Sequence, residues 1–276
     1  MARRHLCYTD APTSCDTLCA GGGPPGGGNE CPHWKRREEG RQEKVKPCPE
    51  RLQLEEIDTS LKIVEMRWKE IDDELDLRGI GRKDTPFTAT IRMRMMSAYS
   101  YLDTLLSQQI PPFSSESIGH MLLLNQRVHY GTDQLLLSEY VKAREATAEK
   151  FYQHIGPIQE WYERHKTQGD HPLKLAAEIY VSILGYPQLY IEGNHRTGSL
   201  IANWITVYHG FPPFVLSIDN AIAYFAPSAE IKSFADKSTW RGRARLPKYR
   251  KSFLAFWERH IDSRYLIQTR RKDACL

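Results

Sequence analysis

Two segments with helical periodicity, joined by a short polar loop, constrain the fold more than any other part of the chain. Residues 170–186 repeat apolar or small side chains at spacings of three and four, and residues 197–208 do the same. Between them lies the sequence QLYIEGNHRTG, from Gln188 to Gly198. This pattern predicts two helices joined by a tight turn, with the loop at the mouth of the second helix.

The loop carries the side chains expected of a phosphate site. The first turn of a helix offers unpaired N–H groups and the positive end of its dipole, which suit an anion. Gly193 lets the backbone approach a phosphate, and Asn194 can cap the helix or donate to an oxygen. Arg196 can neutralise a second phosphate, and Glu192 can hold a divalent cation that bridges phosphates. The alternative is an ordinary loop and N-cap. A Walker P-loop fits less well, because Ser199 stands where that motif has lysine.

The same stretch resembles the signature of the Fic/Doc (Fido) family, His-Pro-Phe-x-Asp/Glu-Gly-Asn-Gly-Arg, here spanning Gln188 to Arg196. The resemblance covers residues 160–216 and is weaker back to residue 85. It implies an all-α, Fido-type helical bundle. In active members of the family it also implies transfer of AMP from ATP, with Mg²⁺, to a hydroxyl group of a target protein, whereas the Doc branch transfers phosphate. The resemblance assigns Glu192 to the metal and the following residues to the nucleotide: Gly193, Asn194, His195, Arg196, Thr197 and Gly198.

Departures from the motif bear on activity. Gln188 stands where active members have the histidine that takes the proton from the attacking hydroxyl, and a carboxamide does not titrate near neutral pH. His195 replaces the second glycine, and Ser199 replaces a distal arginine. His195 is a candidate substitute base, because imidazole titrates near pH 6.5; the other interpretation is a helix cap or a phosphate donor.

The sequence after Tyr130 predicts no β-hairpin. Active members of the family carry such a hairpin as a flap that docks the target peptide, but here helical periodicity runs from Leu135 to Tyr152 without an alternating strand pair. We therefore expect a nucleotide site with altered or lost AMP transfer to a protein target. The alternative is a catalytically inactive nucleotide-binding or protein-interaction module.

Residues 1–48 differ from the rest of the chain. They are rich in glycine and proline, hold five of the six cysteines and show no apolar periodicity, which predicts a disordered low-complexity tail. The cysteine spacings match no paired zinc pattern and favour reduced thiols, as in a cytoplasmic protein. The start has no apolar signal-peptide core, and no run of about 18 apolar residues predicts a membrane span.

Residues 49–80 predict an amphipathic helix that extends the domain. Its apolar seam has heptad spacing, which is typical of a homodimer or partner interface but also of a helix packed on its own domain. The seam consists of Leu54, Ile57, Leu61, Val64, Trp68, Ile71 and Leu75.

Residues 85–262 are assigned to the Fido-like helical domain. We expect one helix to open at Thr85-Pro86 and to run to about Gln108. Further along the chain, we expect helical segments to be interrupted at Gly156-Pro157 and around Pro227. The basic stretch from Arg241 to Lys251 predicts a solvated loop before a packing helix. Nucleic-acid binding is the less favoured alternative, because the net charge of the chain, +4, is small. Residues 263–276 predict a basic C-terminal tail.

Overall fold

The computed structural model describes residues 50–80, 86–234 and 236–267. The predicted tail 1–48, with its five cysteines, lies outside this part of the chain. The described residues form ten α-helices, a short 3₁₀ helix and isolated β-bridges but no strand, so the all-α prediction is confirmed. The elements are α1 (Leu54–Met66), α2 (Trp68–Leu77), α3 (Ala89–Ser107), α4 (Ser117–Tyr130), α5 (Gln134–Glu139), α6 (Val141–Thr167), α7 (Pro172–Leu184), α8 (Asn194–Tyr208), α9 (Ile218–Phe234), α10 (Trp240–His260) and η1 (Ser263–Tyr265).

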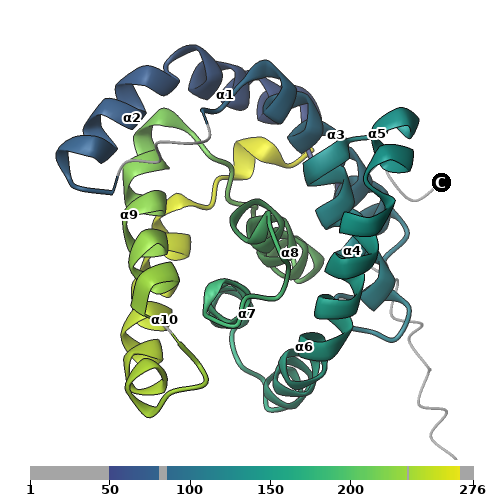
Figure 1. The fold of residues 1–276 in the computed structure, drawn as a ribbon, viewed down its shortest axis with the longest axis vertical. Helices are drawn as coiled ribbons and strands as arrows, with labels where there is room; N and C mark the ends of the chain where they lie inside the picture. Colours follow the sequence, from purple (N-terminus) through teal and green to yellow (C-terminus); the bar gives the residue numbers. More distant parts are fainter. Residues whose placement is uncertain (1–49, 81–85, 235, 268–276) are drawn as a thin grey trace, which may run out of the picture. The chain divides into compact units, whose positions relative to one another are not determined.

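The helices α7 and α8 form the centre of this folded unit (Figure 1). They pack on each other; α10 packs on α7, while α3 and α4 pack on α8. Every residue of α8 from Thr197 to Val207 is buried, as expected for a helix surrounded by others. A β-carbon at Gly198 would lie 3.2 Å from Cδ2 of Tyr180, so Gly198 permits the close contact between α7 and α8.

The predicted helix over residues 49–80 is two helices, with a break at Arg67. All seam residues except the partly buried Leu54 are buried, with α1 on α3 and α2 on α9. The Trp68 ring packs against Phe87 and Phe225, at centroid distances of 5.9 and 5.8 Å. The seam therefore packs within the chain, the second of the two interpretations, and does not offer a dimer surface.

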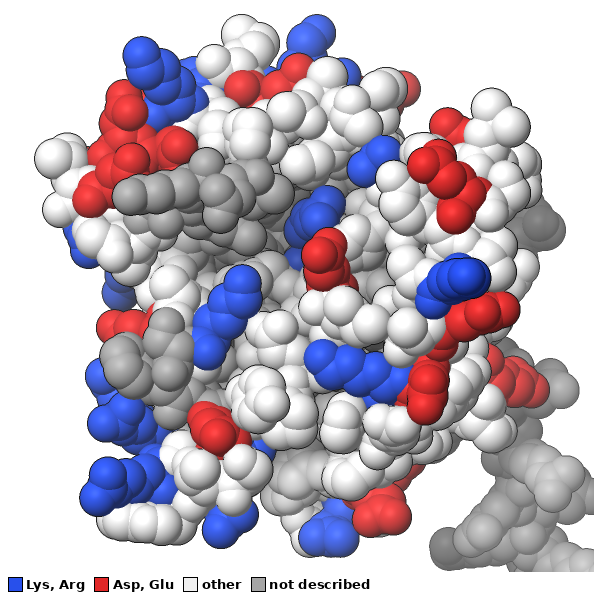
Figure 2. Space-filling view, viewed as in Figure 1, with Lys and Arg blue, Asp and Glu red and all other residues white. Residues whose placement is uncertain are grey.

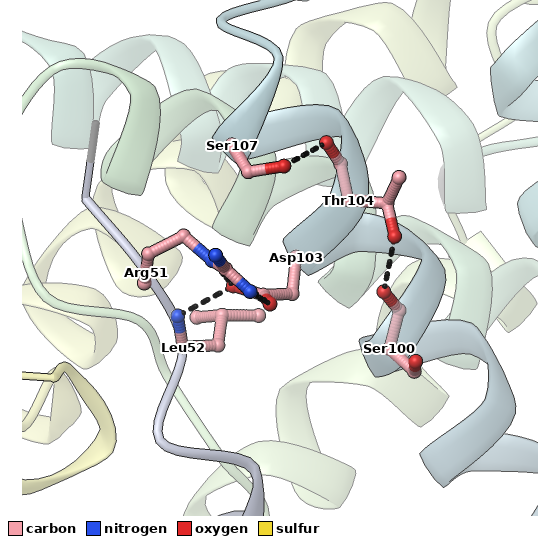
Figure 3. Close-up of polar contacts among 6 residues, drawn as sticks. All are labelled: Arg51, Leu52, Ser100, Asp103, Thr104 and Ser107. Atoms are coloured by element: carbon pink, nitrogen blue, oxygen red, sulfur yellow. Dashed lines mark hydrogen bonds and ion pairs between the residues drawn. The ribbon is translucent and has the colours of Figure 1, made fainter.

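Asp103 of α3 ties the start of the described chain to the helical core (Figure 3). Its buried carboxylate accepts a hydrogen bond from the Leu52 N–H at 2.8 Å and forms an ion pair with the Arg51 guanidinium. The backbone of this segment pairs with the chain after α10: the Gln53 N–H donates to the Tyr265 carbonyl, and the Ile267 N–H donates to the Arg51 carbonyl. Residues 263–267 thus belong to the folded unit, with Tyr265 buried, which corrects the predicted tail over 263–276; residues 268–276 lie outside the described part.

Three helices continue through a proline, contrary to the breaks and the loop expected from the sequence. They are α6 with Pro157, α9 with Pro227 and α10 with Pro247, so the stretch from Arg241 to Lys251 is helical. A proline costs about 3 kcal/mol in a helix interior. Here apolar stripes are buried on both sides of each proline and offset that cost: Phe151, Ile155, Ile158 and Tyr162 in α6, Ala221, Tyr224, Phe225 and Ile231 in α9, and Leu246, Tyr249 and Phe253 in α10.

Two helix starts also differ from the predictions. The helix expected to open at Thr85-Pro86 begins at Ala89, because the Thr88 hydroxyl accepts a hydrogen bond from the Ile91 N–H and caps it. Thr85 itself lies outside the described residues. The helix after the loop begins at Asn194, ahead of the predicted Thr197.

The basic side chains of α10 are largely exposed, and some pair with acids of other helices. Arg250 forms an ion pair with Glu178 of α7, and Lys248 pairs with Glu230 of α9. Acidic and basic side chains are interspersed over the face shown in Figure 2. Among the described helices, none is both long and apolar enough to cross a bilayer.

Candidate functional site

The loop between α7 and α8 lies against the C-terminal half of α4. Gly193 is the N-cap of α8 and has a φ of +75°, in the left-handed region. A β-carbon at Gly193 would lie 2.4 Å from Nε2 of His129 and 3.0 Å from Nδ2 of Asn125, both on α4. Glycine is required here by both the backbone conformation and the contact with α4. The close approach that the sequence suggested toward a phosphate is, in this structure, an approach to a neighbouring helix.

The buried side chain of Asn194 is hydrogen-bonded to other residues of the loop. Its Oδ1 accepts a hydrogen bond from the Tyr190 N–H at 2.8 Å. Its Nδ2 donates to the Tyr190 carbonyl at 3.0 Å and to Oε1 of Gln188 at 3.3 Å. Gln188 in turn donates from Nε2 to the Leu184 carbonyl at the end of α7. Asn194 therefore donates to oxygens of the loop itself and does not cap α8.

Asn125 of α4 fixes the same loop from the outside. Its Nδ2 donates to the Glu192 carbonyl and to the Thr197 hydroxyl, both at 3.0 Å. Thr197 and Gly198 are buried in this contact and in the α7–α8 interface. These two predicted nucleotide-binding residues do not line the cavity at the start of α8 that the other predicted residues share.

The other predicted site residues surround a cavity of about 260 Å³ at the start of α8, here called the loop cavity. One lysine from α9, Lys232, completes its wall. The lining residues are Gln188, Ile191, Glu192, Gly193, Asn194, His195, Arg196 and Lys232.

The charges around the loop cavity favour an anion. The first bond inside α8 runs from the Thr197 N–H to the Gly193 carbonyl, so the preceding amides of the first turn have no acceptor inside the helix. The positive end of the α8 dipole adds to the charges of Arg196 and Lys232. Arg196 is held in place by a hydrogen bond from Nη1 to the Val128 carbonyl at 3.2 Å.

Two imidazoles flank the loop. His195 lines the loop cavity, and its Nδ1 lies 3.3 Å from the Tyr180 hydroxyl, while its carbonyl accepts a hydrogen bond from Tyr224. His129 lies behind Gly193. Burial and the nearby positive charge of Arg196 lower the pKa of His129, which therefore favours its neutral form.

Glu192 is exposed at the rim of the loop cavity. No group of three or more His, Cys, Asp or Glu residues within the described ranges could hold a metal ion. Glu192 would supply one carboxylate to a Mg²⁺ ion, and phosphate oxygens and water commonly complete the coordination of such an ion.

Ser199, at the position of the family's distal arginine, faces away from the loop cavity. It lines a smaller, mainly apolar cavity of about 80 Å³ under α1–α3 and α9, and its hydroxyl donates to the Arg196 carbonyl. The site thus has no second arginine at this position.

Three side chains that shape the site were not predicted from the sequence: Lys232, Asn125 and His129. Lys232 comes from a helix remote in sequence, and nothing in its surroundings signals a role. Asn125 and His129 are four residues apart on α4, so they lie on one face of that helix, and a polar pair on an inward face was the available signal.

The expected absence of a β-hairpin after Tyr130 is confirmed, since α5 and α6 occupy this part of the chain. No known protein-family model matches the chain, and a search of solved structures found no match.

Proposed function

We propose that the loop cavity binds the phosphate groups of a nucleotide, as the resemblance to the Fido family implies, and that AMP transfer to a protein hydroxyl is altered or lost. The observation that carries the proposal is the convergence of Arg196, Lys232 and the N-terminus of α8 on one cavity. Helix N-termini and arginine forks are the groups that proteins use most readily for phosphate.

The size of the cavity limits what it holds. Its volume, about 260 Å³, is just below the range of about 300–1,000 Å³ typical of small-molecule pockets. The cavity would hold a phosphate chain, with the rest of the nucleotide outside it. Glu192 at the rim would supply one carboxylate to a Mg²⁺ ion, whose chemistry is to neutralise charge on the phosphates.

The altered chemistry follows from Gln188. Its amide donates to the Leu184 carbonyl and accepts from Asn194, and it has no ionisable proton near neutral pH. A hydroxyl acceptor therefore finds no general base at this position. His195 is the imidazole that lines the cavity and is the candidate substitute.

The second candidate is a nucleotide-binding module without turnover. It is favoured by the same Gln188 and by the helices α5 and α6, which occupy the place expected for a peptide-docking flap. In this case binding would be retained while transfer is absent.

Two measurements separate these functions. Calorimetry with ATP, AMP and inorganic phosphate, with and without Mg²⁺, should give binding that Lys232→Gln weakens and Arg196→Ala weakens further, because each removes a positive charge from the cavity. Incubation of the wild type and of Gln188→His with ATP labelled at the α-phosphate and cell lysate tests transfer. Label transfer by either protein supports the enzyme, and binding without transfer supports the module. Absence of binding by all three ligands would refute the proposal.

A further inference from the structure

A second cavity, of about 390 Å³, is also lined by Ile191 and Glu192 of the loop and is larger than the loop cavity. It is enclosed by α3, α4, α5, the start of α6 and the loop, and is here called the α3–α6 cavity. Its volume falls within the range of small-molecule pockets. The side chains that bear on its chemistry are Arg94, Arg144, Tyr130, Tyr140, Leu122 and Glu192.

Arg94 is the first indication of a ligand. It is half-buried on α3, lines the cavity, and makes no ion pair or hydrogen bond with any described residue. By contrast, Arg51, Arg92 and Arg250 are each paired with a carboxylate. No carboxylate of the described chain pairs with Arg94, so its guanidinium is available to an anion that enters the cavity.

Arg144 adds a second positive charge to the wall. Its Nη1 donates to the Leu137 carbonyl at 2.9 Å and its Nη2 donates to Gln126 at 3.3 Å, which ties α5 to α4 and α6. These partners are neutral, so the guanidinium charge is not compensated by a carboxylate of the described chain. Glu192 is the one acid in the lining, against two arginines.

The rest of the lining combines aromatic and apolar side chains with four polar ones, namely Asn125, Gln126, His129 and Thr147. The rings of Tyr130 and Tyr140 are stacked, with centroids 5.5 Å apart and planes 26° apart, and Leu122, Leu136 and Ile191 lie around them. Ile191, which is part of the lining, is 47% exposed. A flat or apolar group would be removed from water on this surface.

We propose that the α3–α6 cavity binds a small organic anion, whose carboxylate or phosphate pairs with Arg94 while its apolar or aromatic part lies against Tyr130 and Tyr140. The geometry matches a site of mixed lining, in which a few charged groups orient a ligand that is otherwise held by apolar contacts. The proposal stands independently of the nucleotide proposed for the loop cavity, because the two cavities share only Ile191 and Glu192.

Titration of isotope-labelled protein with phenyl phosphate, followed by NMR, tests this site. We expect saturable shifts of amides around Arg94, Tyr130 and Arg144, and no such shifts with benzyl alcohol, which keeps the ring but lacks the charge. Arg94→Gln should weaken phenyl phosphate binding at least tenfold, and Arg94→Lys should recover part of the affinity. Since Arg94 bonds to no described residue, both variants should fold, which circular dichroism and thermal melting would verify.

Lys232→Gln is the matched control, because Lys232 lines the loop cavity and not the α3–α6 cavity. It should leave phenyl phosphate affinity at the α3–α6 cavity unchanged while weakening inorganic phosphate at the loop cavity. If the wild-type protein bound phenyl phosphate at the α3–α6 cavity but no inorganic phosphate at the loop cavity, the nucleotide proposal would fail and the present proposal would stand. Shifts confined to the loop cavity, or equal affinities of wild type and Arg94→Gln, would overturn it.

Discussion

Gly193 is the residue on which the local geometry of the loop depends most. Its φ of +75° disfavours any side chain, and a β-carbon would overlap His129 at 2.4 Å. Gly193→Ala should therefore lower the free energy of unfolding by about 2–4 kcal/mol, of which about 1–2 kcal/mol is backbone strain. Urea denaturation monitored by tryptophan fluorescence would measure this loss.

Gly210 provides the control for that experiment. It also has a positive φ, +82°, but a β-carbon there would meet nothing within 4 Å. Gly210→Ala should lose only the strain component, about 1–2 kcal/mol. Equal losses for the two variants would show that the contact between Gly193 and His129 is not restrictive in solution.

His129 makes the stability of the folded protein depend on pH. Its pKa is lowered in the folded protein, first by burial and then by the charge of Arg196, whereas an exposed histidine titrates near pH 6.5. As the pH falls below about 6.5, the unfolded chain binds more protons than the folded protein, so stability is present above that pH and is lost below it. His129→Gln should therefore flatten the decrease of the urea midpoint between about pH 7.5 and about pH 5.5.

Part of the decrease should remain in that variant. His209 and His260 also have lowered pKa values, caused mainly by burial, and they act in the same direction. A slope identical to that of the wild type would mean that His129 is protonated as easily in the folded protein as in the unfolded chain.

At the scale of elements, α4 positions the loop through one amide. Asn125 is buried and donates to both the Glu192 carbonyl and the Thr197 hydroxyl. Asn125→Ala should cost about 1–3 kcal/mol, because it leaves buried acceptors without a donor. It should also increase hydrogen exchange of amides in residues 189–197, measured by mass spectrometry.

Asn220 is the matched control for Asn125. It is buried as well, but it bonds the Val215 carbonyl and the Ser217 N–H ahead of α9, away from the loop. Asn220→Ala should destabilise the protein without faster exchange in residues 189–197. Faster exchange there in both variants would indicate that the loop responds to global stability and not to its contact with α4.

The helices around the loop could be predicted from the sequence because their apolar residues repeat at helical spacing. The breaks expected at Pro157 and Pro227 are wrong, because the tertiary contacts of the buried stripes outweigh the local cost of a proline. The helix α8 begins earlier than expected, because Asn194 resembles a cap in the sequence but turns inward and bonds to Tyr190.

The candidate site was predictable only where it is contiguous in sequence. Glu192, His195 and Arg196 could be named from the loop itself, and they do share a cavity. Lys232 and the α3–α6 cavity depend on helices brought together by folding, which periodicity in one sequence does not reveal.

At the scale of the whole folded unit, the seam of α1 and α2 is part of one hydrophobic core with α7, α8 and α10. Trp68 is 6% exposed and contacts Phe225 of α9, so Trp68→Ala should cost about 3–5 kcal/mol. Met66, which is 73% exposed on the same segment, serves as the control, and Met66→Ala should leave the urea midpoint unchanged. If Trp68→Ala lowered the free energy of unfolding only slightly, α1 and α2 would not be an integral part of the hydrophobic core.

A variant of Asp103 can test whether the two ends of the described chain unfold together with the core or separately from it. Its carboxylate binds Arg51 and the Leu52 N–H (Figure 3). The backbone of the same segment is hydrogen-bonded to Tyr265 and Ile267. Asp103→Ala would leave the buried Leu52 N–H without its acceptor, so we expect a loss of about 2 kcal/mol, moderated because Arg51 is partly exposed. If both ends are integral to the core, the urea midpoint falls while the transition stays single and keeps its slope.

Glu70→Ala is the control: it breaks the exposed Arg67–Glu70 ion pair and should not move the urea midpoint. An unchanged midpoint in Asp103→Ala, together with faster hydrogen exchange confined to residues 51–53 and 265–267, would show that the ends open independently of the core.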